Sequence, residues 1–400
     1  MEGLSERLLS LAPERPLAAS EARVLVRAAD AHGAVSSAAV HRFCLLDGLV
    51  TGDVWYPNQA AVMPMVPCDE NGVPLSLPAQ PDPFMDEGPW VAAIGAFDGL
   101  HLGHQALVAR AHEEAVRRGA KACAVTFSPD PAEVLVGPRE GTELLPLDRR
   151  TWGLLGLGVD ALVVIDFTPE LAALSYESFV RDVLGHLMDL SALVVGSDFR
   201  LGVGGAGTVS ALSELGARGG FDVLGMDLCS ADGAAITATR IRGLVREGRV
   251  ESAAGLLGRC HQVTGTVEHG RGEGTGFGFP TANVSFSPAT CLPQQGVYAG
   301  FVTAFAREGA TAWPAAINVG MPPTFSPADQ ESKAFLEATL LGYSGDLYGA
   351  EVAVTFVRWL RDSRPFGSVE ELERTVLGNV DWVRKTLGDS GVALAGEVGA

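Results

Sequence analysis

Short apolar runs alternate with amphipathic segments between residues 90 and 258, and no other feature of the chain constrains its fold as strongly. Uninterrupted apolar runs are typical of strands buried on both faces of a parallel sheet, and amphipathic segments are typical of the helices that cover such a sheet. The pattern therefore predicts an α/β domain with a doubly wound parallel sheet. Its predicted strands are 91–94, 122–127, 161–165, 192–195 and 223–226, and its predicted helices are 104–119, 148–156, 176–188 and 207–218.

The loop after the first predicted strand, residues 95–104, reads GAFDGLHLGH and leads directly into a helical pattern. Its three glycines allow the backbone to turn sharply and to approach a ligand closely. His101 and His104 then lie near a helix N-terminus, where unpaired amides and the macrodipole favour anions and imidazole N–H groups add donors for phosphate. Strand, glycine turn, HxGH and helix in this order predict a nucleotide site, and a surface loop with two exposed histidines is the alternative.

After residue 258 the sequence pattern changes to short β-like runs separated by Gly and Pro, which is typical of a small antiparallel β-barrel. A final helical pattern at 368–387 opens with Ser368 and Glu371, which have the spacing of a capping box. The sequence therefore predicts that a second, β-rich domain follows the α/β domain. Its predicted strands are 262–267, 296–304, 315–319, 335–341 and 351–357.

The N-terminal part of the chain carries no motif of its own. Residues 20–31 and 35–43 have the spacing of amphipathic helices, and 49–56 has the composition of a strand. Basic residues are few, so a packing or oligomerisation arm is favoured over a DNA-binding module. The predicted division is an N-terminal extension (1–66), a Pro-rich linker (67–89), the α/β domain (90–258), the barrel domain (259–388) and a flexible tail (389–400).

Composition excludes several classes of partner. A net charge of -19 argues against a broad nucleic-acid or anionic-membrane surface, because such binding scales with the number of Lys and Arg side chains that neutralise phosphates. Six cysteines without a CxxC pair indicate neither a zinc site nor a disulfide framework. The N-terminus has no long apolar segment, and no uncharged apolar stretch long enough to span a membrane follows it. We therefore expect a cytoplasmic protein with neither a membrane nor a nucleic-acid partner.

From about residue 90 to residue 387 the motifs resemble those of the bacterial bifunctional riboflavin kinase/FMN adenylyltransferase (FAD synthetase) family. The matching stretches of the first half are GAFDGLHLGH (95–104), TFSPDP (126–131), GSDFRLG (196–202) and TATRIR (237–242). Those of the second half are HGRGEGTGFGFPTAN (269–283), GVYAG (296–300), NVGMPPTF (318–325), LEATLLGYSGDLYG (336–349) and LRDSRPFGSVEEL (360–372). The resemblance implies a Rossmann-like nucleotidyltransferase domain followed by a riboflavin-kinase-like antiparallel β-barrel. It also implies ATP and Mg2+ as cofactors, with riboflavin, FMN and FAD as substrates or products.

For the first half, the resemblance implies transfer of AMP from ATP to FMN, with release of pyrophosphate. It assigns His101 and His104 to the phosphates of ATP and Arg242 to the departing pyrophosphate. Other residues implied at the nucleotide are Gly95, Phe97, Asp98, Gly103, Thr237 and Thr239, and those implied near the flavin are Asp198, Phe199 and Asp130.

For the second half, the resemblance implies transfer of the terminal phosphoryl group of ATP to the ribityl 5'-hydroxyl of riboflavin. It assigns Glu337 as the carboxylate that accepts the proton of this hydroxyl. Thr281 and Asn283 are implied as ligands of the Mg2+–nucleotide complex, since both carry oxygen donors. Gly270 and Gly278 bound a glycine-rich run whose amides are implied at the phosphates.

Several positions depart from the family pattern. Asp130 stands where the family has a His, Ala238 where it has a Ser, Pro322 where it has an Arg and Thr339 where a His is common. Two other interpretations therefore stay open: a nucleotidyltransferase that acts on a modified flavin or a non-flavin phosphate with a vestigial kinase domain, and a non-catalytic flavin or nucleotide sensor. Assembly into a homo-oligomer is also open.

Overall fold

The computed structural model describes residues 20–29, 35–46, 49–50, 88–137, 140–269, 281–306, 309–320, 334–363 and 368–394. The chain divides into two compact units. The first, the sheet unit, comprises residues 11–139 and 146–236, and the second, the barrel unit, is built from residues 140–145 and 237–400. The helices α10 (Ala238–Arg246) and α11 (Val250–Leu257) thus belong to the barrel unit, although the sequence pattern assigns them to the α/β domain. Among the described residues, none of the helices has the length and apolar character needed to cross a bilayer.

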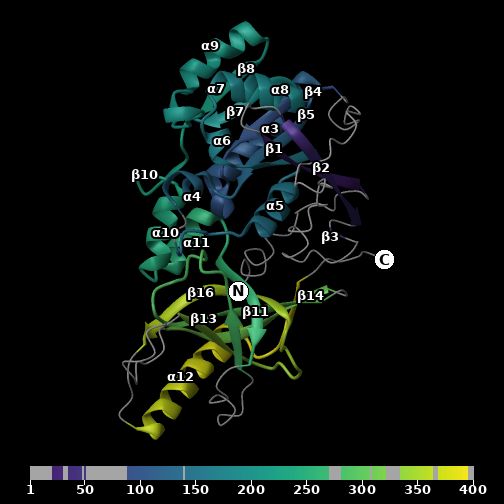
Figure 1. The fold of residues 1–400 in the computed structure, drawn as a ribbon. Coiled ribbons are helices and arrows are strands. Elements are labelled where there is room, and N and C mark those ends of the chain that lie inside the picture. Colours follow the sequence, from purple (N-terminus) through teal and green to yellow (C-terminus); the bar gives the residue numbers. More distant parts are fainter. Residues whose placement is uncertain are drawn as a thin grey trace, which may run out of the picture. The chain divides into compact units, whose positions relative to one another are not determined.

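The sheet unit is built on five parallel strands in the order β6-β5-β4-β7-β8, and this confirms the predicted α/β fold (Figure 1). The interiors of the three central strands are buried on both faces, as their uninterrupted apolar runs predict. The strands are β4 (Pro89–Ile94), β5 (Lys121–Ser128), β6 (Ala161–Asp166), β7 (Asp189–Gly196) and β8 (Asp222–Met226).

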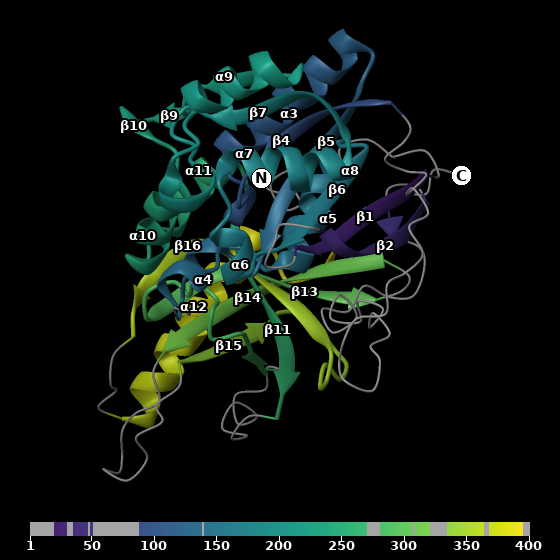
Figure 2. The same cartoon turned by 45° about the horizontal axis from the view of Figure 1, so that its top comes forward.

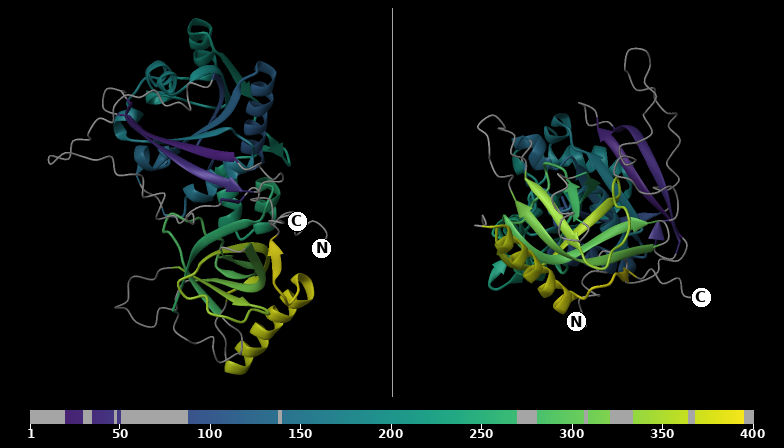
Figure 3. Two further views of the ribbon diagram at one scale, coloured as in Figure 1. Left: turned by 90° about the vertical axis from the view of Figure 1, so that its right-hand side faces the viewer. Right: turned by 90° about the horizontal axis from the view of Figure 1, so that it is seen from below.

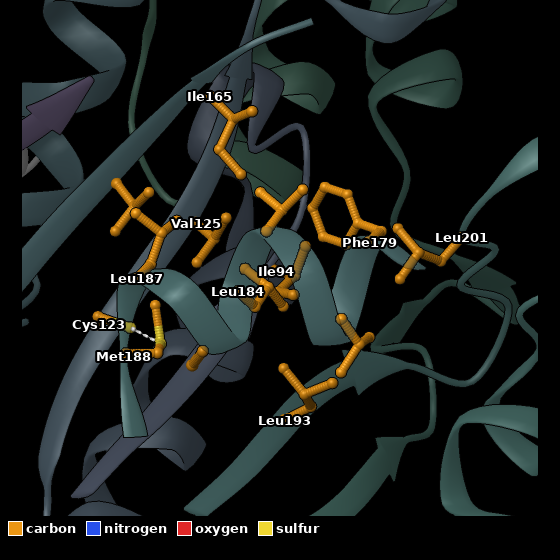
Figure 4. Packing of buried hydrophobic residues seen from close by; sticks show 14 of the residues in the cluster. Ile94, Cys123, Val125, Ile165, Phe179, Leu184, Leu187, Met188, Leu193 and Leu201 are labelled. Atoms are coloured by element: carbon orange, nitrogen blue, oxygen red, sulfur yellow. Dashed lines mark hydrogen bonds between the residues drawn. The ribbon is translucent and has the colours of Figure 1, made fainter. Parts of the chain in front are cut away.

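Helices cover both faces of this sheet. On one face, α3 (Leu102–Arg118) packs against β4, β5 and β7. The other face is covered by a helical segment made of α7 (Tyr176–Ser178), the π-helical turn η2 (Phe179–Leu184) and α8 (Gly185–Leu187), whose apolar side chains meet alternate residues of the strands (Figure 4). Further elements of the unit are η1 (Asp98–Leu100), α4 (Pro131–Val136), α5 (Leu147–Gly156), α6 (Pro169–Ala172), η3 (Val203–Gly205), α9 (Val209–Gly219), β9 (Ser230–Ala231) and β10 (Ala234–Ala235).

Three N-terminal strands extend the sheet beyond β6: β1 (Ser20–Ala29), β2 (Val35–Leu46) and β3 (Leu49–Val50) (Figure 3). The helices predicted at 20–31 and 35–43 are therefore wrong. The edge of β6 offers a row of backbone donors and acceptors, and β1 pairs with it in parallel, with Val24 opposite Leu162 and Val26 opposite Val164. This long-range pairing overrides the local helical spacing. Of the strand predicted at 49–56, residues 51–56 lie outside the described residues.

The barrel unit confirms the predicted antiparallel barrel (Figure 2). Six strands follow the order β13-β16-β11-β12-β15-β14, and pairing of β13 with β14 closes the ring. The backbones of β13 and β16 approach each other closely at Gly300. A Cβ at this position would lie 1.9 Å from the carbonyl oxygen of Thr355, so only glycine fits there. The strands are β11 (His261–Glu268), β12 (Thr281–Ser285), β13 (Gly296–Ala306), β14 (Gly309–Gly320), β15 (Phe335–Leu340) and β16 (Glu351–Asp362).

The C-terminal helix α12 (Val369–Leu387) lies against the outside of the barrel (Figure 3). Its N-terminus is capped as predicted, because the Ser368 hydroxyl accepts a hydrogen bond from the Glu371 amide at 3.2 Å. The segment after the helix is not irregular throughout, since β17 (Val392–Leu394) pairs with β14. The tail therefore differs from the flexible segment that its composition predicts, because β14 provides an edge for pairing.

Candidate active sites

The loop after β4 has an unusual backbone. Phe97 and Leu100 adopt positive φ angles of 54° and 41°, and Gly99 has a φ of 76°. Non-glycine residues rarely take this conformation, and it persists only where the surroundings hold it. Here the Phe97 ring is fully buried in the core, which fixes the turn. The loop therefore delivers the next residues to the start of α3 in one defined geometry.

His101 and His104 lie at the helix N-terminus, as the sequence predicts. His101 is the N-cap of α3, and its Nδ1 accepts a hydrogen bond from the His104 amide at 3.3 Å. In the neutral imidazole this leaves the proton on Nε2. The two rings are stacked, with centroids 3.6 Å apart and planes inclined by 18°, and the Phe97 ring meets His104 edge-on at 5.3 Å. The pair is thus a preorganised set of imidazole nitrogens beside the positive end of a helix dipole.

Gly103 provides the space that this arrangement needs. A Cβ at this position would lie 3.2 Å from the His101 ring and 3.7 Å from the carbonyl oxygen of Ile236. Ile236 directly precedes Thr237, the first residue of the TATRIR motif. The lack of a side chain at Gly103 therefore leaves room for the His101 ring and for the backbone at Ile236.

Two side chains to which the sequence assigns no role hold the loop in place. The carbonyl oxygen of Ala96 accepts hydrogen bonds from the Arg150 guanidinium at 2.6 Å and from the Thr126 hydroxyl at 3.1 Å. Both side chains are buried, with Arg150 only 4% exposed. A signal for Arg150 exists in the sequence, because it lies on the apolar stripe of its helix with Leu147 and Leu154. A charged residue on such a stripe needs a polar partner inside the protein.

The residues expected near the flavin follow strands that neighbour β4. Asp130 follows β5, and its carboxylate accepts a hydrogen bond from the Ala132 amide at 2.8 Å as the N-cap of α4. Asp198 follows β7 and is exposed, whereas Phe199 is half-buried and packs against the core. Because the carboxyl ends of parallel strands meet at one edge, these residues lie at the same edge of the sheet as the HxGH loop.

The TATRIR motif forms the start of α10 in the barrel unit. The Thr237 hydroxyl caps this helix by accepting a hydrogen bond from the Arg240 amide at 3.2 Å. The Arg242 guanidinium donates to the hydroxyl of Thr239 and to the carbonyl oxygen of Thr142, each at 3.2 Å. A guanidinium and two hydroxyls are thus gathered in the first turns of a helix, a set that suits phosphate oxygens.

A row of polar residues crosses three strands of the barrel. Glu337 on β15 is in register with Asn283 on β12 and with Asn318 on β14, and residues paired in this way point to the same face of a sheet. Their sequence neighbours are buried in the barrel core, so the polar row faces outward. We call Asn283, Glu337 and Asn318 the polar row.

Thr281 extends this face. It precedes Asn283 by two residues on β12 and therefore points the same way, and Thr339 is its partner on β15. Hydroxyl, carboxamide and carboxylate oxygens are hard ligands of the kind that Mg2+ prefers, so the donor set of Thr281, Asn283 and Glu337 fits this ion. The predicted Gly270 and Gly278 lie outside the described residues.

An aromatic side chain flanks the polar row on the other side. Phe335 pairs with Gly320 on the same outer face as Glu337 and Asn318. A Cβ at Gly320 would lie only 2.6 Å from the Phe335 ring, so the ring lies directly over the glycine. No role is assigned from the sequence to Phe335 or to Asn318, the first residue of the NVGMPPTF stretch, although the alternation of Asn318 with apolar neighbours in its strand marks it as outward-facing.

Two known protein families match this chain, one over the region of the parallel sheet and the other over the region of the barrel. Residues 85–240 match the family model described as FAD synthetase, and residues 257–387 match the one described as riboflavin kinase. The first match contains the HxGH loop, and the second contains the polar row.

Individual proteins with both regions are also similar to this chain. A bifunctional riboflavin kinase/FMN adenylyltransferase of Pseudomonas fluorescens is 34% identical over 290 residues, which cover 72% of this chain and 90% of the relative. The protein of the same description from Escherichia coli strain K12 is 32% identical and that from Bacillus subtilis 30% identical, each over 72% of this chain and 89% of the relative. Among solved structures, one described as a macrolide-efflux protein from Streptococcus pneumoniae has a TM-score of 0.66 and 27% identity, and the match covers 74% of this chain and 94% of that chain.

Proposed function

The chain belongs to the family of bifunctional riboflavin kinase/FMN adenylyltransferases, and we propose that it phosphorylates riboflavin to FMN and adenylylates FMN to FAD. The observation that carries this proposal is that one chain has both the stacked His101–His104 pair at a helix N-terminus and the polar row with Glu337 on a closed barrel. Each arrangement supplies the groups that one of the two reactions needs.

In adenylylation, a phosphate oxygen of FMN attacks the α-phosphorus of ATP, and the bond to the bridging oxygen of pyrophosphate breaks. The nucleophile is already an anion, so positioning and charge stabilisation make up the catalysis. His101 and His104 hold the phosphates of ATP in this proposal, with Gly95, Phe97, Asp98 and Gly103 shaping their loop. Thr237, Thr239 and Arg242 are assigned to the leaving pyrophosphate, and Asp130, Asp198 and Phe199 to the flavin side.

In phosphorylation, the primary hydroxyl of riboflavin attacks the terminal phosphorus of ATP, and ADP leaves. A neutral alcohol must lose its proton, and we assign Glu337 as the carboxylate that accepts it. Thr281 and Asn283 would hold Mg2+ through their oxygens, and the ion, when bound, neutralises charge on the phosphate oxygens. Gly270 and Gly278 are assigned to the same phosphates.

Two variants of the full chain test the proposal. Wild type incubated with riboflavin, ATP and Mg2+ should yield FMN and then FAD, separated by chromatography. His104→Ala should still make FMN but little FAD, whereas Glu337→Gln should make FAD only from supplied FMN. Absence of both products from wild type would overturn the proposal. FAD from FMN without FMN from riboflavin would support a vestigial kinase domain, and flavin binding without either product would support a sensor.

A further inference from the structure

The carboxamide of Asn318, on β14 of the barrel unit, has a buried oxygen. This oxygen, Oδ1, has no hydrogen-bond partner among the described residues. A buried acceptor of this kind is costly unless a donor reaches it, and nearly all such groups in folded proteins find one. The structure therefore contains an acceptor whose donor must come from outside the described residues.

The neighbours of Asn318 in the sheet explain why its oxygen lacks a donor. On one side is Glu337, and a carboxylate group only accepts hydrogen bonds. On the other side is Val297 of β13, which is apolar and buried. Neither cross-strand partner offers an N–H or O–H group, so a ligand over the polar row is the natural source of one.

We infer that Asn318 is a substrate-binding residue for phosphoryl transfer, and that its Oδ1 accepts a hydrogen bond from the secondary hydroxyl next to the primary hydroxyl that reacts. This inference rests on the proposed kinase function of the same site. Glu337 takes the terminal hydroxyl and Asn318 takes its neighbour.

The spacing of the row matches this pair of hydroxyls. Directly opposed residues on antiparallel strands have Cβ atoms about 4.5 to 5.5 Å apart, so their side-chain oxygens converge on adjacent atoms of a bound chain. A site that is built to bond a substrate hydroxyl discriminates strongly against an analogue that lacks it, because its buried polar group is then left unpaired. The contact with Asn318 therefore adds specificity for the polyol end of the substrate as well as positioning the alcohol.

A cycle that combines a protein variant with a substrate analogue tests the inference. Asn318→Leu keeps the approximate volume of the side chain and removes the acceptor, and 4'-deoxyriboflavin lacks the secondary hydroxyl. The full chain is assayed for phosphorylation of riboflavin and of the analogue, with and without the substitution. With riboflavin, the variant should lose about 10-fold to 100-fold in kcat/KM. With the analogue, the loss should be less than about 3-fold, because the paired hydroxyl is already absent.

Equal losses with both substrates would overturn the inference, because the donor would then be something other than the hydroxyl, for example a metal-bound water. A titration of the flavin fluorescence without ATP gives the same comparison as binding constants. If wild type fails to phosphorylate riboflavin, the proposed kinase function falls, and the titration still decides whether Asn318 pairs with the hydroxyl.

Stability measurements separate this role from a structural one. Asn318→Leu removes a buried acceptor without a partner, so its thermal unfolding midpoint should not fall. Gln262→Leu is the matched control, because the Gln262 amide donates to the hydroxyl of Thr355 at 2.9 Å. The control should lower the midpoint and affect both flavins equally. A fall in the midpoint for Asn318→Leu as large as that of the control would contradict the inference.

Discussion

Glu114 anchors the helix that carries the two histidines, and Glu114→Gln should destabilise that helix. The carboxylate is 1% exposed and accepts hydrogen bonds from Nε of Arg117 at 3.0 Å and from Nε of Arg118 at 2.8 Å. Arg118 also pairs with Asp222 at 2.5 Å, which connects α3 to the edge strand β8. The hydrogen bonds from Arg117, and after them those from Arg118, hold the pKa of Glu114 at about 2 instead of 4.5.

The size of the effect follows from this displacement of the pKa. A change from 4.5 to about 2 corresponds to roughly 3 kcal/mol at neutral pH. Arg117 is 65% exposed and screened by solvent, so we expect about 1 to 3 kcal/mol for Glu114→Gln. Because the folded state has the lower pKa, this stabilisation is complete above pH 4.5 and is lost as the pH falls from 4.5 toward 2. The loss of stability that Glu114→Gln causes relative to wild type, here called the deficit, should therefore be smaller by about 1 kcal/mol at pH 4 than at pH 7.

Hydrogen exchange of the α3 amides measures this loss of stability in the helix that carries Glu114. The variant and wild type are compared at the same pH, so that the intrinsic exchange rates cancel. Glu113→Gln is the control, because Glu113 is 68% exposed and forms a surface ion pair with Arg110 at 3.5 Å. Its effect should stay within about 0.5 kcal/mol. Equal deficits for the two variants, or a deficit for Glu114→Gln that is the same at pH 7 and pH 4, would refute the reasoning.

Three further predictions concern single positions. Gly103→Ala places a Cβ 3.2 Å from the His101 ring, so FAD formation should fall at least about 10-fold while FMN formation stays within a factor of two. Gly320→Ala places a Cβ 2.6 Å from the Phe335 ring, and the opposite pattern of product loss should follow in the same assay. Burial lowers the pKa of His261 to about 4, so below pH 6.5 the unfolded chain binds a proton that the folded barrel excludes. The unfolding midpoint of the barrel should drop as the pH falls from 6.5 toward 4, and His261→Gln should flatten that dependence.

Local patterns predict those parts of the fold that local physics determines. The strands of the parallel sheet are buried on both faces, so their apolar runs are visible in the sequence, and the start of α12 is marked by its cap at Ser368. The error at 20–31 and 35–43 has a different origin. Residues such as Val24 and Val26 suit either a helix face or a strand, and the free edge of β6, which is formed more than a hundred residues later, decides between them.

The candidate sites show the same division between local and long-range information. His101 and His104 form one turn of one helix, so a tetrapeptide is enough to find them. The NVGMPPTF stretch contains Asn318 but assigns it no role, because only the pairing of β14 with β15 puts it beside Glu337, where its oxygen has no donor among the described residues. Arg150 likewise binds a loop from which it is separated in sequence by two helices, α3 and α4, and one strand, β5. The histidine pair is thus visible in a short motif, whereas the contact of Arg150 with the loop and the position of Asn318 beside Glu337 depend on tertiary structure. Variants at Asn318 and Arg150 should therefore change substrate discrimination and loop geometry more than they change the chemistry assigned to Glu337 and His104.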